Sequence, residues 1–450
     1  MCDNSTSLQS IWNVVFINRA KSSALSIAFR FLSILLAAIP VLALTEDWLV
    51  QDVSAIAAAL LLLLLAFRAS QEDLKITARL LRSMAPALLF PLAWMVLQIA
   101  PLNLFSNSIW PTASVALNEP LSGHISIEPG ATIRSLFAYL TAASLTVATM
   151  IFTRDRERAE TTLLVMCALT TFMSVVVFLG QFQILSVPNT TTFIAICALG
   201  AVVNVAAAVR IIERRLSRRE DVASLSTVLW FCLGLAAAAS CLAAILVAGR
   251  GSIAIVAAFG IAVVLLVGTS RLLALGPAIS SLLFVILAVA VVGTITLRFE
   301  ESQTVIAILR FATSAPGDSL SVTQRALSDA KWVGSGVGTF DALVPIYRDF
   351  GTRTMIEPAS TIAKILIEWG RAPSIILVLI AVQLSVVLFA GALRRGRDWF
   401  FPAAAAGAIV VLFCEVFCDS SLTHPLSQIL VAVILGLGFS QTIGRTSGGL

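Results

Sequence analysis

Apolar blocks about 20 residues long, enough to cross roughly 30 Å of hydrocarbon as helix, alternate along the chain with short polar segments. A membrane β-barrel would need strands in which apolar and polar residues alternate, and these continuous runs exclude it. The sequence therefore predicts an all-α polytopic membrane protein with about 12 transmembrane helices. The predicted spans are 23–44, 51–67, 84–102, 134–152, 161–180, 190–210, 224–248, 252–269, 273–297, 373–393, 400–418 and 425–442.

The composition also excludes an ordinary soluble protein. Of the 450 residues, 58% are hydrophobic and only 12% are charged, whereas soluble domains carry about 25% charged residues. The seven cysteines lie almost all inside apolar blocks. Because they lack the spacing of metal ligands, we interpret them as packing residues of membrane helices.

The lysines and arginines indicate how the spans are oriented. When alternate loops are assigned to opposite sides, every loop on one side carries Lys or Arg, including the cluster Arg210–Arg219. Loops rich in these residues favour the cytoplasmic side of a membrane. We therefore expect both termini to be cytoplasmic.

Residues 299–371 form the longest polar interruption, and we expect them to be a large extracytoplasmic loop. They separate transmembrane helices 1–9 in residues 1–298 from helices 10–12 in residues 372–450. Two amphipathic stretches of the loop, Thr304–Thr313 and Ser321–Lys331, predict helices along the membrane surface or over a cavity. The arginines of this loop oppose the orientation signal, although long loops escape that bias.

The loop contains a glycine-rich segment, Gly334–Phe340. Glycine lets backbone amides approach a ligand closely, and a group of N–H donors suits phosphate. The segment is not a dinucleotide fingerprint, since no strand precedes it. A plain structural turn is the alternative, and the sequence leaves both interpretations open.

Arg250 lies outside this loop, in the tight turn Val247–Ser252 between two long apolar spans. A charge near membrane depth usually faces a cavity or a partner and marks a functional candidate. Guanidinium groups form paired, charge-assisted hydrogen bonds with phosphate oxygens. Outward-facing arginines beside a membrane therefore suit a lipid pyrophosphate headgroup, with ordinary phospholipid headgroups as the alternative.

Five segments of the chain form a set of motifs in a fixed order along the sequence. The segments are Trp332–Phe340 with Pro345–Arg348, Ile367–Gly370, Gly249–Ser252, Ile127–Thr132 and Phe417–Pro425. Together they resemble the O-antigen ligase and polymerase family, which are membrane glycosyltransferases of bacterial surface polysaccharides. The order, spacing and sidedness of the motifs carry the resemblance more than any single one.

The resemblance implies transfer of a glycan from undecaprenyl diphosphate to an acceptor glycan or glycolipid at the periplasmic face of the bacterial inner membrane. Such enzymes make lipopolysaccharide or exopolysaccharide and resemble inverting transferases that need neither a nucleotide sugar nor a metal or other cofactor. The implied partners are the lipid-linked oligosaccharide, the acceptor and the lipid bilayer, with no nucleic acid. On this resemblance, Arg250, Arg348 and Arg325 bind the diphosphate leaving group.

The chain departs from the family at the residue expected to be the catalytic base. The family usually has a histidine just before the helix that ends in Glu-x-Gly, whereas this chain has Glu357–Thr361 there. Either a carboxylate, Glu357 or Asp341, is then the base toward the acceptor hydroxyl, or the chain has lost or changed the activity. The only two histidines, His124 and His424, lie in other outward loops, and we interpret them as polar loop residues.

Two further carboxylates are ambiguous. Glu368 follows Lys364 by four residues, a spacing that predicts an ion pair on a helix surface. Glu415 lies inside an apolar span near its outer end, where a charge is costly enough to make it a functional candidate.

Two other functions stay open. A transporter would show internal repeats, helices broken near the bilayer midplane and charges along a path, and we find no convincing repeat. A non-catalytic subunit of a polysaccharide assembly or export complex is favoured only by the missing histidine. The sequence does not distinguish a ligase from a polymerase.

Overall fold

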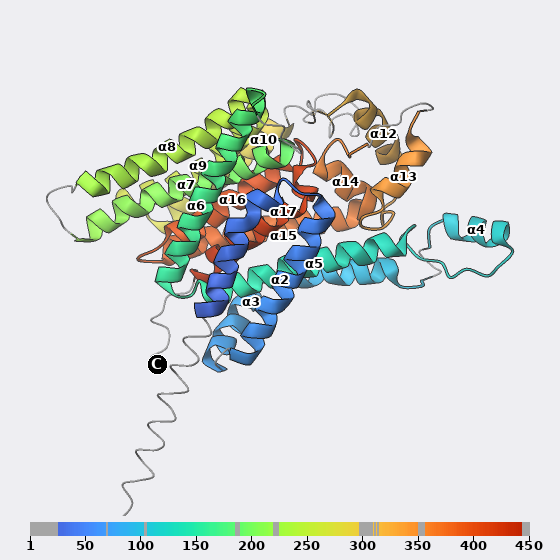
Figure 1. Cartoon of the computed structure of the whole chain (residues 1–450), viewed down its shortest axis with the longest axis horizontal. Helices are drawn as coiled ribbons and strands as arrows, with labels where there is room; N and C mark the ends of the chain where they lie inside the picture. Colours follow the sequence, from blue (N-terminus) through green and yellow to red (C-terminus); the bar gives the residue numbers. More distant parts are fainter. Residues whose placement is uncertain are drawn as a thin grey trace, which may run out of the picture.

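Helices are the only regular elements in the described part of the computed structural model (Figure 1). The structure describes residues 26–68, 71–102, 106–184, 190–218, 225–296, 309, 312, 315–349 and 356–442. The predicted all-α fold class is therefore confirmed for these ranges.

The bounds of the helices follow the apolar blocks closely. The first helix is Ser26–Leu42. It is followed by α2 (Asp47–Arg68), α3 (Gln71–Ile99), α4 (Ile109–Leu117), α5 (Pro129–Phe152), α6 (Arg156–Gln181), α7 (Thr190–Arg218), α8 (Leu225–Val247), α9 (Gly251–Leu272) and α10 (Pro277–Thr296). The remaining elements are α12 (Gly317–Ser328), α13 (Phe340–Tyr347), α14 (Thr361–Glu368), α15 (Arg371–Arg394), α16 (Phe400–Glu415), the 3-10 helix η2 (Ser421–Thr423) and α17 (Pro425–Ser440).

Among the described residues, eight helices are long and apolar enough to cross a membrane. They are α2, α3, α5, α6, α7, α8, α9 and α15. Four more apolar helices, including α16 and α17, are shorter, with 10–17 residues each. The chain is thus a multi-pass helical membrane protein, and the total of about 12 spans stays a prediction.

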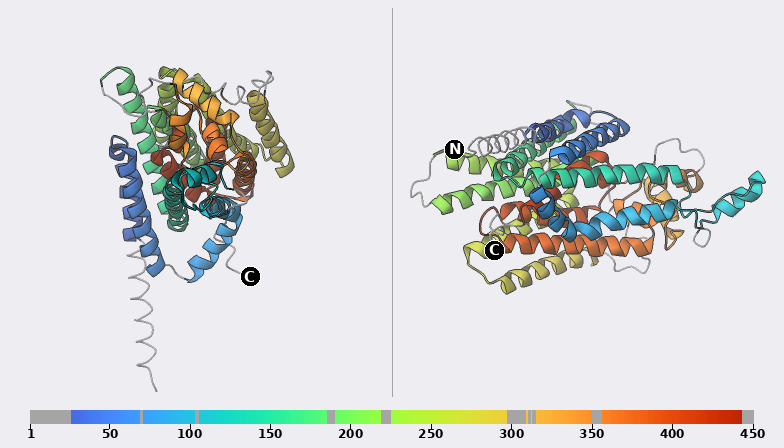
Figure 2. Two further views of the ribbon diagram at one scale, coloured as in Figure 1. Left: turned by 90° about the vertical axis from the view of Figure 1, so that its right-hand side faces the viewer. Right: turned by 90° about the horizontal axis from the view of Figure 1, so that it is seen from below.

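Helix α7 lies at the centre of the bundle, where it packs against α6, α8, α9 and α16 (Figures 1 and 2). Glycines permit the closest helix contacts around it. A Cβ atom at Gly200 of α7 would lie 2.4 Å from Thr170 Cβ of α6, and one at Gly407 of α16 would lie 2.5 Å from Gly260 O of α9. Small residues let membrane helices approach closely, and close packing drives their association.

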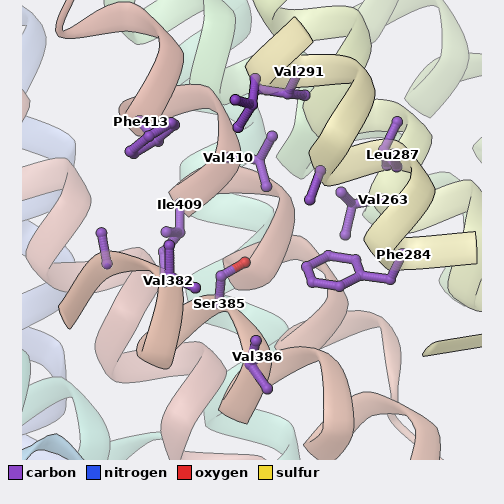
Figure 3. Close-up of a pocket in the computed structure, with 13 residues that line it drawn as sticks. Val263, Phe284, Leu287, Val291, Val382, Ser385, Val386, Ile409, Val410 and Phe413 are labelled. Carbon is purple, nitrogen blue, oxygen red and sulfur yellow. The ribbon is translucent and has the colours of Figure 1, made fainter. Parts of the chain in front are cut away.

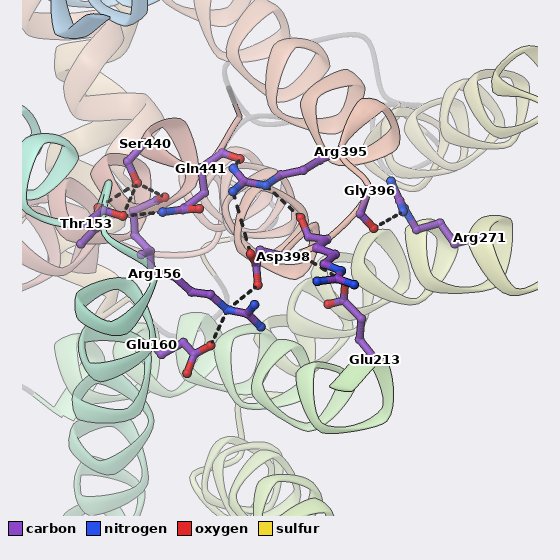
Figure 4. A network of polar contacts seen from close by, with 12 residues as sticks. Thr153, Arg156, Glu160, Glu213, Arg271, Arg395, Gly396, Asp398, Ser440 and Gln441 are labelled. Carbon is purple, nitrogen blue, oxygen red and sulfur yellow. Dashed lines mark hydrogen bonds and ion pairs between the residues drawn. The ribbon is translucent and has the colours of Figure 1, made fainter. Parts of the chain in front are cut away.

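A polar network joins several helix ends at one end of the bundle (Figure 4). Asp398, in the connection between α15 and α16, pairs with Arg156 of α6 at 3.2 Å, and its amide donates to Glu213 of α7 at 3.1 Å. Arg156 also pairs with Glu160 at 3.0 Å, and Arg395 lies 4.0 Å from Asp398. This Asp398 network fastens the α15–α16 connection to α6 and α7.

The helices α12, α13 and α14 form a small separate core. Residues of all three are buried together, among them Leu327, Phe340 and Ala363. The predicted amphipathic stretch Ser321–Lys331 overlaps α12, whose apolar face packs against α13 and α14. The other stretch, Thr304–Thr313, lies outside the described residues except for positions 309 and 312.

Candidate functional site

A second group of polar side chains lies at the opposite end of the bundle from the Asp398 network. Helices α9, α16 and α17 each have one end near that network and the other end at this group. We call the group the Arg250 cluster. It comprises Asp47, Arg250, Glu357, Asp419, Ser420 and His424.

A glycine turn places Arg250 at the start of α9. Gly249 has a φ of +72°, in the left-handed region that glycine adopts at no steric cost. The Arg250 amide donates to Ile245 O at 3.1 Å and the Gly249 amide to Leu246 O at 2.9 Å, a pattern that ends α8 as a Schellman motif. The chain reverses at once, so that Arg250 becomes the N-cap of α9.

The connection between α16 and α17 supplies much of the cluster. Thr361 at the start of α14 donates its amide and its hydroxyl to Asp419 O, each at 2.8 Å. The Ser421 amide donates to Asp419 Oδ1 at 3.0 Å. Helix α14 is therefore docked on this connection. Glu357, four residues before the start of α14, consequently lies beside Ser420. The Ser420 hydroxyl donates to Glu357 Oε2 at 3.2 Å.

Arg250 acts electrostatically on Asp419. Burial raises the pKa of the Asp419 carboxyl above its ordinary value, while the Ser421 hydrogen bonds and the positive charge of Arg250 oppose that rise. No hydrogen bond or ion pair joins the half-buried Arg250 guanidinium to another residue in the described ranges. Its N–H donors are consequently available to an anionic ligand.

His424 is held by Asp47. Its Nδ1 atom lies 2.7 Å from Asp47 Oδ2, which joins the start of α17 to the start of α2. The negative charges of Asp47 and Glu357 act on His424 together with the positive charge of Lys364. His424, interpreted from sequence as a polar loop residue, therefore lies among charged groups from α2 and from the segment that contains α14.

Glu415 lies one helical turn before Asp419 and is completely buried. Neither of its carboxyl oxygens has a hydrogen-bond partner among the described residues. One oxygen of Asp419, Oδ2, is also without a partner in those ranges. Buried polar groups are normally hydrogen-bonded, so this pair of carboxyls is unusual and stays a functional candidate.

The glycine-rich segment is a structural turn. The Gly336 amide donates to Glu368 O at 3.0 Å, and the Phe340 amide donates to Glu368 Oε1 at 3.1 Å. A Cβ atom at Gly334, which has a φ of +80°, would lie 2.2 Å from Glu368 O. The glycines allow the turn to pack against the end of α14, and these amides are bonded within the protein rather than offered to a phosphate.

The prediction that Glu368 is half of a surface ion pair with Lys364 is wrong. Glu368 is only 3% exposed and its carboxyl accepts the amides of Phe340 and Gly338. Burial raises the pKa of Glu368, and the charge of Lys364 and the two amides oppose the rise. Helix periodicity revealed the proximity to Lys364 but not the turn that covers Glu368.

The other predicted site residues lie on α12 and α13. Arg325 forms two hydrogen bonds of 2.8 Å with the Asp349 carboxylate and a third with Tyr347 O. The Arg325 guanidinium holds the pKa of Asp349 below its ordinary value. Arg348 follows α13 and is exposed, and Asp341 lies in the first turn of α13. In the described ranges, no hydrogen bond or ion pair joins these side chains to Arg250.

An apolar groove runs between α9, α10, α15 and α16 (Figure 3). Its cavity volume is about 110 Å³, and it is lined by valine, leucine, isoleucine, alanine and phenylalanine side chains. Ser385 is the one polar residue among those lining it, and its buried hydroxyl has no hydrogen-bond partner in the described ranges. Helix α9, whose N-cap is Arg250, contributes Val263 to the groove, and α16, which ends at Glu415, contributes Ile409, Val410 and Phe413.

Comparison of the chain with models of known protein families finds no match, and a search of curated proteins finds no significant relative.

Of the five predicted site residues, Arg250 and Glu357 belong to the Arg250 cluster, Arg250 through its charge on Asp419 and Glu357 through the Ser420 hydroxyl. Sequence reasoning did not assign Asp47 or His424 to a site, because their partnership joins positions 377 residues apart. The sequence did single out the region of Asp419, because this residue lies in the motif Phe417–Pro425. That motif indicated a resemblance without giving the carboxylate a partner.

Proposed function

We propose that the chain is a glycosyltransferase that transfers a glycan from undecaprenyl diphosphate to an acceptor saccharide at the periplasmic face of the bacterial inner membrane. The observation that carries the proposal is the Arg250 cluster. One arginine with available donors lies beside carboxylates and an imidazole, at one end of a membrane bundle. A lipid-linked diphosphate sugar needs such a combination, with a cation for the leaving group and a base for the acceptor hydroxyl.

The sidedness of the charges supports the periplasmic location. The opposite end of the bundle carries the Asp398 network with Arg156 and Arg395, and the neighbouring Arg394 and Arg397 add to its positive charge. Loops rich in arginine favour the cytoplasm. The Arg250 cluster then faces the periplasm, and both termini are cytoplasmic.

The apolar groove supports a lipid-linked donor. A polyprenyl chain is a flexible hydrocarbon, and the groove on α9, α10, α15 and α16 offers it an apolar surface at membrane depth. Because α9 has Arg250 as its N-cap and contributes Val263 to the groove, one helix would contact both the diphosphate and the chain. Arg348 and Arg325 stay proposed diphosphate ligands, and Arg325 would have to leave Asp349 to act as one.

A transporter is the second candidate, and Glu415 is the observation that favours it. A buried carboxyl without a hydrogen-bond partner in the described ranges is the kind of group that proton or ion pathways use. A role as a non-catalytic assembly subunit is compatible with the same fold but makes no use of the Arg250 cluster.

The proposal is tested in the host strain by deleting the gene and restoring it as wild type or as Arg250→Ala. The matched control is Arg134→Ala, because Arg134 is an exposed arginine paired at 3.1 Å with Glu128. Polymer is examined on gels, and lipid-linked glycans are extracted and weighed by mass spectrometry. Their side of the membrane is read from oxidation by periodate, which does not cross the membrane.

Wild type and Arg134→Ala should restore polymer, whereas Arg250→Ala should reduce transfer about 100-fold or more, as expected for loss of a transition-state contact. Lipid-linked glycan should then accumulate on the periplasmic side. Accumulation on the cytoplasmic side would instead indicate a transporter of the lipid-linked glycan. Normal polymer with Arg250→Ala would refute the diphosphate role.

A further inference from the structure

The Asp47–His424 pair has the geometry of an oriented imidazole. His424 is the residue directly before α17 and Asp47 is the first residue of α2, so each side chain projects from a helix start. The Nδ1–Oδ2 distance of 2.7 Å is that of a strong, charge-assisted hydrogen bond. A carboxylate can only accept, so Nδ1 must carry the hydrogen and donate it to Asp47.

This bond determines what the other ring nitrogen does. With the hydrogen on Nδ1, the neutral ring has its lone pair on Nε2, which accepts a proton. In the described ranges, no hydrogen bond joins Nε2 to another residue. His424 is nine-tenths buried whereas the Asp47 side chain is 44% exposed, so the imidazole is fixed in the protein while its partner reaches solvent.

His424 also lies where the proposed reaction needs a base. Its ring interacts electrostatically with Glu357 and with Asp419. Glu357 accepts a hydrogen bond from Ser420, and Asp419 interacts with the charge of Arg250. Glu357 Oε2 already accepts the Ser420 hydroxyl at 3.2 Å. Of Glu357 and His424, only His424 is held in a single tautomer by a neighbour, Asp47. Its acceptor atom, Nε2, is then left unbonded in the described ranges.

We propose that His424, oriented by Asp47, is the proton acceptor for the incoming acceptor hydroxyl, a role that rests on the proposed glycosyl transfer. The acceptor oxygen attacks the anomeric carbon and forms the new glycosidic bond. The bond from that carbon to the diphosphate oxygen breaks, and undecaprenyl diphosphate leaves with the electron pair beside Arg250. The hydroxyl proton moves to His424 Nε2, and Asp47 and Glu357 stabilise the resulting imidazolium.

The charged surroundings suit this role. Burial lowers the pKa of His424, but the hydrogen bond and charge of Asp47 and the charge of Glu357 outweigh burial and the opposing charge of Lys364, so that the pKa is raised above its ordinary value. An imidazole ordinarily titrates near pH 6.5, and a base is most effective when its pKa is close to the working pH. The surrounding carboxylates therefore make His424 a stronger base.

The test uses the full-length protein reconstituted in lipid nanodiscs with lipid-linked glycan extracted from the deletion strain and the host's acceptor glycan. Transfer is measured as released undecaprenyl diphosphate, across pH 5 to 9, for His424→Gln and Asp47→Asn. The matched controls are His124→Gln, which replaces the only other histidine, and Asp52→Asn, which replaces an exposed carboxylate of the same helix α2. Arg250→Ala is measured alongside.

His424→Gln should lower the maximal rate about 10²–10⁴-fold, the usual contribution of a general base, with little change in the KM for the donor. In Asp47→Asn the pKa of His424 falls, so the acid limb of the rate profile should move to lower pH as the maximal rate drops. Arg250→Ala should raise the KM for the donor as well as lower the rate. Both control variants should behave as wild type.

The outcomes separate the two proposals. Full activity of His424→Gln with an inactive Arg250→Ala would overturn the role of His424 and leave the transferase intact. Full activity of both variants would refute the proposed function itself. A purely structural role of His424 predicts less folded protein with an unshifted pH profile in Asp47→Asn, and that result would also overturn the inference.

Discussion

Replacing Glu368 by alanine should release the glycine-rich turn. The Glu368 carboxyl accepts the Phe340 amide at 3.1 Å and the Gly338 amide as well. Hydrogen bonds to a charged group contribute about 1.5–3 kcal/mol each. Removing both acceptors from a buried site should therefore cost about 3–6 kcal/mol locally, because the two amides would be left without partners. The Phe340 amide is also the first of α13, whose N-terminus favours an anion.

Hydrogen–deuterium exchange of the peptide covering 334–347 measures this cost directly. A factor of ten in exchange corresponds to about 1.4 kcal/mol, so Glu368→Ala should speed exchange at Gly338 and Phe340 at least 100-fold. Glu368→Gln keeps one acceptor oxygen and should give an intermediate rate. The matched control is Lys364→Ala, on the same helix α14.

The two interpretations of Glu368 predict opposite results here. If Glu368 were a surface partner of Lys364, both alanine variants would change stability by no more than about 0.5 kcal/mol. Exchange of the 334–347 peptide that is equal in Glu368→Ala and Lys364→Ala would refute the structural role of the buried carboxyl.

Three further changes test the packing and the charges. Gly334→Ala combines a left-handed φ of +80° with a backbone oxygen 2.2 Å from the new Cβ, so it should cost about 2–5 kcal/mol, seen as a loss of monodisperse protein in detergent. Asp398→Ala removes a buried carboxylate whose partner Arg156 is 42% exposed. It should cost about 1.5–3 kcal/mol, as for a hydrogen bond to a charged group, measured with a dye that labels buried cysteines as the protein unfolds. The pKa of His424 is raised in the folded protein, so its pairing with Asp47 stabilises the fold fully below about pH 6.5. This contribution to stability is lost as the pH rises through the folded-state pKa of His424. Asp47→Asn should therefore lower the unfolding temperature more at pH 5.5 than at pH 8.5, unlike Asp52→Asn, and an equal loss at both values would contradict the pairing.

The helices were predictable because continuous apolar runs are sufficient to indicate membrane helices. Their ends were less predictable, since hydropathy records burial in lipid and not helix formation. Helix α3 begins at Gln71, well before its apolar block, and α7 extends to Arg218 beyond its own block. Glutamine, lysine, glutamate and arginine are good helix formers, and they continue a helix past the apolar part.

The site was predictable only where a local rule applied. Arg250 was identified because a charge in a tight turn between two apolar spans is costly, and Glu357 because of its position before α14. The Asp47–His424 pair had no local signal, because the two residues come together only when α2 and α17 pack side by side. The buried role of Glu368 was hidden for the same reason, since the turn that covers it is remote in sequence from the i,i+4 partner that periodicity suggested.

The turn and the Arg250 cluster are linked through α14. At the C-terminal end of this helix, Glu368 accepts a hydrogen bond from the glycine-rich turn. At its N-terminal end, Thr361 donates a hydrogen bond to the α16–α17 connection. Glu357 precedes the helix, so its place beside Ser420 depends on both attachments. Loss of the Glu368 bonds should therefore reduce transfer together with amide protection, whereas Arg250→Ala should reduce transfer with protection unchanged. Normal transfer in Glu368→Ala, despite fast exchange in the turn, would show that the docking on Asp419 alone holds α14 and the base-side groups in place.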